Sequence, residues 1–223
     1  PMAYYFGPDI ELQKKAFTLN RQKEVVTLIR TMFLKRFESS AKAFELSCET
    51  LFVKLLAWLT KNSTTDAEKK RLDRWQNQHE QIISYVKANH KVLFQDENDV
   101  EEDLISEEIL EDIKELPRSE CNVDEIIAET FLDLDQICEF LKEIQKLTPA
   151  NDDKLKTLIN LLNTDPVLKV HKVIIFSEFM ATARYLKKQL IDAGFKQVDA
   201  VDSATKKSRS DVIRNFAPFY NRP

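Results

Sequence analysis

Glycine is nearly absent from this sequence, with only Gly7 and Gly194 among 223 residues. Glycine provides the tight turns of all-β folds and the close backbone approach of phosphate-binding loops. Its scarcity therefore argues against β-sandwiches, barrels and Gly-rich loops. Hydrophobic residues make up 43% of the chain and charged residues 31%, which is typical of a globular domain with a heavily charged surface. The composition favours a helical fold.

Cysteine is also sparse, and long apolar runs are missing. Cys48, Cys121 and Cys138 lie far apart without CxxC or CxxH spacing, so we predict free, buried thiols in a reducing compartment and no zinc or other metal site. No apolar run approaches the roughly 20 residues of a membrane span, and there is no signal-peptide pattern. We therefore expect a cytoplasmic protein that does not enter a membrane.

The net charge of −4 conceals an uneven distribution. Residues 95–120 hold twelve Asp and Glu against Lys114 and Arg118, a local charge of −10 that leaves +6 on the rest of the chain. We expect part of this acidic stretch to be mobile. Basic residues gather in 14–42 and 169–214, which fits nucleic-acid contact at both ends, but solvated helix faces give the same pattern.

The first two thirds of the chain have the apolar spacing of amphipathic helices. Ser39 and Ser40 mark a break or a new N-cap, and Thr65 with Glu68 fits a capping box. The helices predicted from this spacing cover residues 21–37, 40–61, 65–90 and 124–147. We expect the polar helix 65–90 to protrude with a single apolar stripe.

The pattern changes near residue 152. A short helix over 152–162 is followed by a β-branched, apolar run at 172–177 that is typical of a central parallel strand. The remaining predicted elements are a helix at 181–193 that ends at Gly194, a strand at 197–201 and a helix at 204–216. The predicted fold is mostly α: a helical bundle with a C-terminal partial α/β unit containing a short parallel sheet. Since two strands rarely form a stable sheet, either the chain is a fragment or the sheet is completed by something else.

Four stretches of this C-terminal part match a known motif set. Lys172-Val-Ile-Ile-Phe-Ser-Glu-Phe179 matches K-V-[LI]-I-F-[ST]-x-[FY], and a K-x-x-x-L helix precedes it. Thr182, Tyr185-Leu186 and Leu190 follow at the expected positions. Ser203-Ala-Thr205, Arg209, Ile213 and Asn215-Phe216 then resemble G-S-[TS]-x-x-x-x-R-x-x-x-[IV]-x-x-F, with Asp202 in place of the usual Gly. These stretches resemble the opening of the second RecA-like domain in Swi/Snf-type ATPases of helicase superfamily two.

Upstream, Leu34-Lys-Arg-Phe-Glu-Ser-Ser40 resembles the junction between the two RecA-like lobes of this family, in the form found in bacterial helicases. The resemblance covers about 100 of the 223 residues. It implies an internal fragment with two parts. Residues 1–148 would be an interlobe and helical insertion region, and residues 152–223 the N-terminal portion of the second, truncated RecA-like domain. The resemblance depends on one structural expectation above all: Val173–Phe176 should pair in parallel with Val198–Val201.

The chain lacks the parts that would hydrolyse ATP. There is no G-x-x-x-x-G-K-[ST] loop to bind phosphates and no DEAH-like acidic strand end to hold Mg²⁺. The resemblance implies that ATP and Mg²⁺ bind only in a full-length parent, a DNA-dependent ATPase or translocase. We therefore expect the chain alone to bind no cofactor and to be inactive as an enzyme.

The candidate functional residues follow from the resemblance. Nucleic-acid backbone contacts are expected from residues at the end of the first strand and at the start of the last helix: Ser177, Phe179, Ser203, Thr205, Lys206, Lys207 and Arg209. N-capping explains the two serines equally well, and a solvated first turn would explain the basic residues. Lys35 and Arg36 would steady the interlobe junction or reach phosphate. An ion pair with Glu38 is the simpler alternative.

Two other functions remain open at this point. The helical insertion and its acidic stretch are also the pattern of a module that docks a partner protein within a larger bacterial protein. A complete small helical protein with a coincidental α/β tail is the third possibility. The partners expected are therefore DNA, the rest of the same polypeptide, and a protein partner at the helical insertion.

Overall fold

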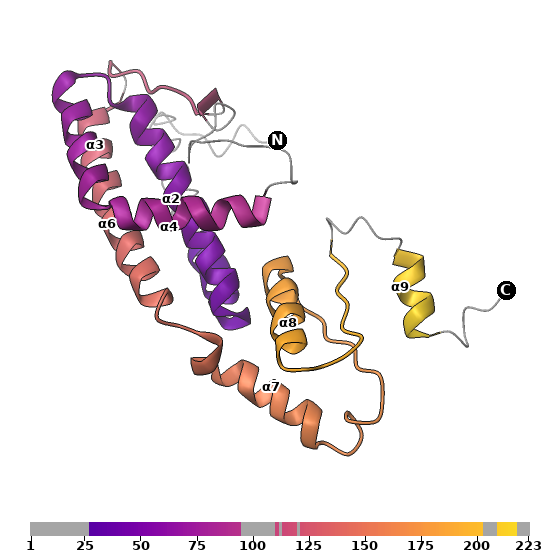
Figure 1. Cartoon of the computed structure of the whole chain (residues 1–223). Coiled ribbons are helices and arrows are strands. Elements are labelled where there is room, and N and C mark those ends of the chain that lie inside the picture. The colour runs from indigo at the N-terminus through magenta and orange to yellow at the C-terminus, as the bar shows by residue number, and fades with distance from the viewer. Residues whose placement is uncertain (1–26, 95–109, 112, 120, 203–208, 218–223) are drawn as a thin grey trace, which may run out of the picture.

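The computed structural model describes residues 27–94, 110–111, 113–119, 121–202 and 209–217. A first helix over 27–39 is followed by a series of helices, labelled as in Figure 1. They are α2 (Ala41–Asn62), α3 (Asp66–Gln78), α4 (Glu80–Phe94), α6 (Val123–Ile144), the 3-10 turn η2 (Pro149–Asn151), α7 (Asp153–Thr164), α8 (Met180–Asp192) and α9 (Arg209–Phe216). The prediction of a mostly α protein is confirmed.

The core lies among α2, α3, α4 and α6, which form one group in Figure 1. Helix α2 is buried on most sides, as its bulky residues on both faces predict. The interior is filled by apolar side chains from all four helices, including Phe52, Leu56, Leu59, Trp75, Val86, Phe131, Leu134 and Leu141. None of the helices in these described ranges is long and apolar enough to cross a membrane.

The predicted helix boundaries are confirmed where capping residues define them. The hydroxyl of Ser40 accepts a hydrogen bond from the Ala43 N–H and begins α2. Thr65 and Glu68 form the reciprocal capping box at the start of α3. Gly194 follows α8 with φ +90°, the left-handed conformation that favours glycine after a helix. Local hydrogen-bonding side chains therefore set these ends, as the sequence indicates.

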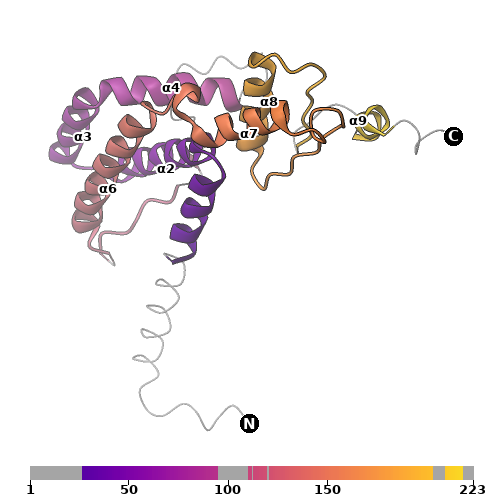
Figure 2. The same cartoon turned by 90° about the horizontal axis from the view of Figure 1, so that it is seen from below.

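The single protruding helix predicted over 65–90 is wrong. His79 has φ −110° and ψ 19°, which ends α3, and α4 begins at the next residue. The ring of His79 stacks on Trp75 at 4.3 Å, and its Nδ1 lies 3.0 Å from the Trp75 carbonyl oxygen. The break lets Trp75 of α3 and Val86 of α4 both enter the core, so the two helices pack on the bundle instead of projecting from it. The part that does project is helix 27–39, drawn in indigo in Figure 2.

The predicted parallel sheet is not formed. Residues 172–177 and 197–201 are not strands, and the described part of the chain contains no strand at all. A strand needs a neighbour for its backbone groups, and Val173–Phe176 have none here. Ile174 is 56% exposed and Phe176 is 90% exposed. In the second segment Gln197 has φ 60°, which interrupts an extended backbone.

The remaining C-terminal elements agree better with the prediction. Helix α7 corresponds to the helix expected over 152–162, and α8 to that expected over 181–193. Helix α9 covers the second half of the helix expected over 204–216, because residues 203–208 lie outside the described residues. Most of the acidic stretch, 95–109 together with 112 and 120, lies outside them as well.

Candidate interlobe junction

The end of helix 27–39 meets the start of α8, although about 140 residues separate them in the chain. Ser40 has an extended backbone, with φ −163° and ψ 153°, and this turns the chain from the first helix into α2. Thr182 is the third residue of α8, so its side chain lies in the first turn of that helix. The α8 helix packs beside the N-terminal part of α2 in this way.

Three hydroxyl groups form the centre of this contact. The Thr182 Oγ1 atom lies 2.8 Å from Ser39 Oγ and 2.7 Å from Ser40 Oγ. Thr182 is 5% exposed and Ser40 is 8% exposed, so water does not compete freely for these bonds. We name Ser39, Ser40 and Thr182 the hydroxyl cluster. It links the capping residue of α2 directly to α8.

Arg36 lies beside the hydroxyl cluster, and its guanidinium group contacts other residues of the protein. One of its terminal nitrogens donates to Ser47 Oγ at 2.8 Å, and its guanidinium carbon lies 5.3 Å from the centre of the Phe179 ring. This is the geometry of a cation–π contact. Arg36 therefore takes part in the contact between helix 27–39 and the start of α8, and no ion pair joins it to Glu38 among the described residues. Its role at an interlobe junction stays a prediction. Lys35 is exposed, and within the described ranges its side chain makes no hydrogen bond or ion pair.

Lys154 closes the other side of the junction. Its ammonium group donates to the carbonyl oxygens of Glu38 at 2.5 Å and Ser39 at 3.3 Å, at the C-terminal end of helix 27–39. A cation is favourable there because the last carbonyls of a helix lack internal donors. Asp152 accepts a bond from the Leu155 N–H at the start of α7 and a 2.9 Å bond from the Tyr185 hydroxyl of α8. Burial and this bond raise the pKa of Tyr185, which stays protonated.

A second set of contacts joins the later motif residues to one another. Lys172 donates to the carbonyl oxygens of Asn215 and Phe216, at 3.0 and 2.7 Å, and so holds the end of α9 against the beginning of the 172–177 segment. Arg184 Nε donates to Asp202 at 2.7 Å. Asp202 is the residue that departs from the family pattern, and here it serves as the partner of an arginine on α8.

The predicted nucleic-acid residues are only partly placed. Ser177 is exposed, but its hydroxyl both accepts from the Phe179 N–H and donates to the Phe179 carbonyl, each at 3.2 Å. These bonds form a local turn. The N-capping alternative for Ser177 is wrong, because the N-cap residue of α8 is Phe179 and no side chain caps that helix. Phe179 lies at the junction under Arg36 instead of facing solvent with Ser177. The residues Ser203, Thr205, Lys206 and Lys207 and the side chain of Arg209 lie outside the described residues.

The structure thus brings Arg36 and Phe179 together and adds partners that sequence reasoning did not single out as site residues. Thr182 and Lys154 are ordinary helix residues in the sequence. Thr182 stands at a motif position, and this was the one signal that could have drawn attention to it. Lys154 also stands at a motif position, as the Lys of the K-x-x-x-L helix. The motif does not reveal its partners, which are backbone carbonyls of a helix more than 110 residues away.

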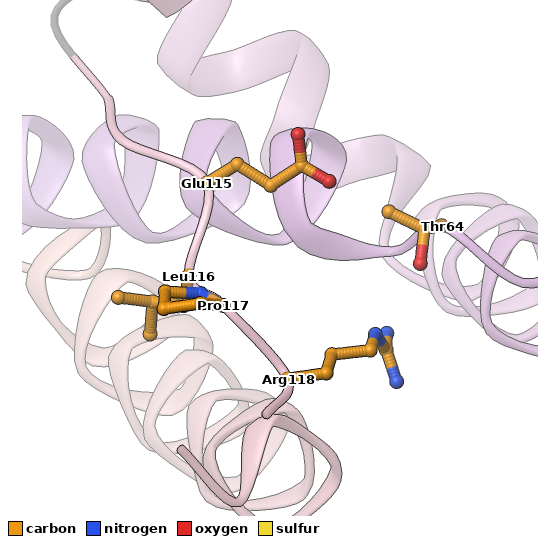
Figure 3. A pocket seen from close by; sticks show the side chains of 5 residues that line it. All are labelled: Thr64, Glu115, Leu116, Pro117 and Arg118. Carbon is orange, nitrogen blue, oxygen red and sulfur yellow. The ribbon is translucent and has the colours of Figure 1, made fainter. Parts of the chain in front are cut away.

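A shallow open pocket lies elsewhere, lined by Thr64, Glu115, Leu116, Pro117 and Arg118 (Figure 3). Its one cation is already engaged: Arg118 donates to both Glu68 oxygens at 2.7 and 2.8 Å and to Asp124 at 2.7 Å. Burial alone would raise the pKa of Glu68, but bonds from the Thr65 N–H and Arg118 outweigh burial and lower it to about 2. The pocket is therefore part of a structural ion-pair network.

In the part of the chain that the structure describes, no group of three His, Cys, Asp or Glu side chains is placed to hold a metal ion. In comparisons with known proteins, no family model, no curated protein and no solved structure matches this chain. The geometry of the junction and the resemblance of its residues are therefore the basis for a functional proposal.

Proposed function

We propose that this chain is part of a nucleic-acid-dependent ATPase of the Swi/Snf type. In this proposal it contributes the junction between two RecA-like lobes, a helical insertion and nucleic-acid backbone contacts. ATP and Mg²⁺ would bind elsewhere in the same polypeptide, in the cytoplasm, so the isolated chain would have no ATPase activity. The two halves of the resemblance are independent stretches of sequence, at 34–40 and at 172–216.

The observation that carries the proposal is the contact between those two halves. Arg36, Ser39 and Ser40 come from the first stretch, and Phe179 and Thr182 come from the second. They meet through a cation–π contact at 5.3 Å and hydrogen bonds of 2.7 and 2.8 Å. If either stretch matched its motif by chance, its motif residues would not be expected to contact those of the other stretch. If the two stretches form an interlobe junction, such contacts are expected.

The exposed segment Val170–Phe176 is where the structure disagrees with the resemblance. The pairing that the resemblance predicts, between Val173–Phe176 and Val198–Val201, is absent, so the proposal cannot rest on it. Instead, Val170, Ile174 and Phe176 expose apolar side chains next to unpaired backbone groups. An exposed apolar strand-forming segment of this kind is unfavourable in water unless a neighbour covers it. We propose that strands from the rest of the polypeptide complete a sheet around it.

Nucleic-acid binding by the isolated chain tests the proposal. We expect weak binding to a fluorescein-labelled DNA duplex in fluorescence anisotropy, with an affinity that falls steeply as salt rises. The double substitution Lys206→Gln/Lys207→Gln should lower the slope of log affinity against log salt by about 0.9 for each phosphate that is no longer neutralised. The matched control is Lys69→Gln/Lys70→Gln on the exposed side of α3, which should leave the slope unchanged. Equal weakening in both variants would show nonspecific attraction only and would contradict the proposed site.

A protein-docking module is the second candidate, and one observation favours it. Helix 27–39 projects from the bundle and exposes Leu28, Met32, Leu34 and Phe37. Pull-down from lysate with the full chain and with its Leu28→Ser/Met32→Ser/Leu34→Ser variant tests docking through this helix. Equal capture by both proteins would rule out docking through helix 27–39.

A further inference from the structure

Two carboxyl side chains of α2 are buried against α4. Glu45 and Glu49 are one helical turn apart and so share a face of α2, and Tyr85 and Asn89 are spaced in the same way on α4. Tyr85 donates its hydroxyl hydrogen to Glu45 Oε1, and Asn89 Nδ2 donates to Glu49 Oε1 at 2.7 Å. We name these four residues the α2–α4 acid contact. It is the polar part of an otherwise apolar interface.

The two carboxyl groups differ in what surrounds them. The second oxygen of Glu45 is 2.5 Å from the Lys42 ammonium group, so Glu45 has a cation as a partner. Glu49 is fully buried, and among the residues that the structure describes its Oε2 has no hydrogen-bond partner. A buried carboxylate without a cation or a donor on one oxygen is costly, whereas the protonated form removes the charge. Burial, together with the negative charge of Glu45, raises the pKa of Glu49 to about 7.

The other helices that pack against α2 supply no group that changes this conclusion. Helix α6 contributes Cys138, whose thiol pKa is raised to about 12 by burial, and the thiol pKa of Cys48 on α2 is raised to about 12 for the same reason. Helix α8 contributes Thr182, which does not titrate, and α3 contributes Leu72 and Trp75. The pKa of Tyr85 is raised by burial and by Glu45, so it keeps its hydrogen. Glu49 is therefore the group of this contact that changes charge near neutral pH.

We propose that the α2–α4 acid contact is a proton-controlled latch: α4 stays docked on α2 while Glu49 carries a proton and loosens when that proton leaves. An opened contact lets water reach Glu49, and its carboxyl then loses the proton at the ordinary pKa of a glutamate, near 4.3. Between about pH 5 and pH 7 the opened form therefore becomes more favourable by up to tenfold for each pH unit. Above about pH 7 both forms are ionised and the effect levels off. The latch is independent of the nucleic-acid role proposed above.

Hydrogen exchange of the intact chain from pH 5 to pH 8, corrected for the intrinsic rate, tests the latch. The opening of α4 should increase by up to tenfold per pH unit up to about pH 7, relative to α6 in the same sample. Glu49→Gln should abolish this increase, because the amide cannot ionise. The control Glu139→Gln removes an exposed carboxylate of α6 and should keep the wild-type behaviour. A ratio of α4 to α6 exchange that does not depend on pH, or an increase that persists in Glu49→Gln, would overturn the proposal.

A ¹³C NMR titration of the glutamate side chains gives an answer that does not depend on exchange. The signal missing from the Glu49→Gln spectrum identifies Glu49. We expect it to titrate near pH 7. Titration between pH 4 and pH 5 would show a solvated or fully paired carboxylate and would contradict the latch.

Discussion

Replacing Thr182 with valine isolates the contribution of the hydroxyl cluster to the junction. Valine has nearly the shape of threonine but carries a methyl group in place of the hydroxyl group. The hydroxyl oxygen that is lost lies 2.7 Å from Ser40 Oγ and 2.8 Å from Ser39 Oγ. Each hydrogen bond contributes about 0.5–1.5 kcal/mol net, so removing two costs about 1–3 kcal/mol. The added methyl group recovers up to about 0.8 kcal/mol of apolar burial. We therefore expect Thr182→Val to lower the free energy of unfolding by about 1–2 kcal/mol.

Urea denaturation followed by circular dichroism at 222 nm measures this change. Thr130→Val is the matched control, because Thr130 is also buried in a helix and bonds only to the Ile126 carbonyl of its own helix. A carbonyl inside a helix already accepts a backbone N–H, so losing the hydroxyl leaves no unpaired group. We therefore expect Thr130→Val to change the free energy of unfolding by less than about 0.5 kcal/mol. Hydrogen exchange should also show faster opening of α8 in Thr182→Val and no change there in Thr130→Val. Equal stabilities of the two variants would refute the view that the cluster holds α8 against α2.

Three other changes test separate parts of the account. Phe176→Ser should alter the stability of the isolated chain by less than about 0.5 kcal/mol in urea denaturation, because the ring is 90% exposed; a decrease of about 3 kcal/mol or more would show that it is buried. Leu141→Ala should lower the free energy of unfolding by about 2–5 kcal/mol in the same assay, since Leu141 is fully buried between α6 and α2; a change below about 1 kcal/mol would contradict that packing. In the folded protein the Glu68 carboxyl stays ionised down to about pH 2, so the free energy of unfolding should fall as the pH drops from about 4.5 to 2. Glu68→Gln should flatten an acid titration monitored by circular dichroism in that range. An unchanged titration would exclude the ion pair of Glu68 with Arg118 as the cause.

The helical part of the fold was largely predictable because its signals are local. Ser40, Thr65 and Gly194 set helix ends through bonds or backbone conformations within three residues of themselves. The apolar spacing over 124–147 identified most of the buried face of α6, including Leu134 and Leu141, whereas Phe140 and Leu147 are exposed. Such features depend on neighbours in the chain, and a single sequence contains them in full.

The errors lie where the outcome depends on distant partners. The break at His79 follows from how Trp75 and Val86 must both reach the core, which the polar spacing of 65–90 does not reveal. The segment Val173–Phe176 has strand-forming residues, but a strand also needs a neighbour, and the described chain provides none. Local propensity favours an extended backbone in this segment, but an extended segment without a neighbouring strand does not form a sheet.

The candidate junction was predictable only in part. Arg36 was singled out from its motif, and its contact with Phe179 joins two residues that the sequence named for different roles. Lys154, Thr182 and Ser40 stand at motif positions, but the bonds that they form depend on how α7 and α8 pack, so no spacing in the sequence reveals those bonds. The burial of Glu49 was likewise hidden, because a glutamate in a helix is ordinarily solvent-exposed.

The most direct test of the proposed function is made on the native protein from its own cells. An antibody raised against residues 41–148 isolates that protein, and its mass and its ATPase activity are measured with and without added DNA. We expect a polypeptide well above the 26.0 kDa of this chain whose ATP hydrolysis increases when DNA is added, while the isolated chain hydrolyses none. A native protein of about 26 kDa, or a larger one with no nucleic-acid-stimulated ATPase activity, would contradict the proposal.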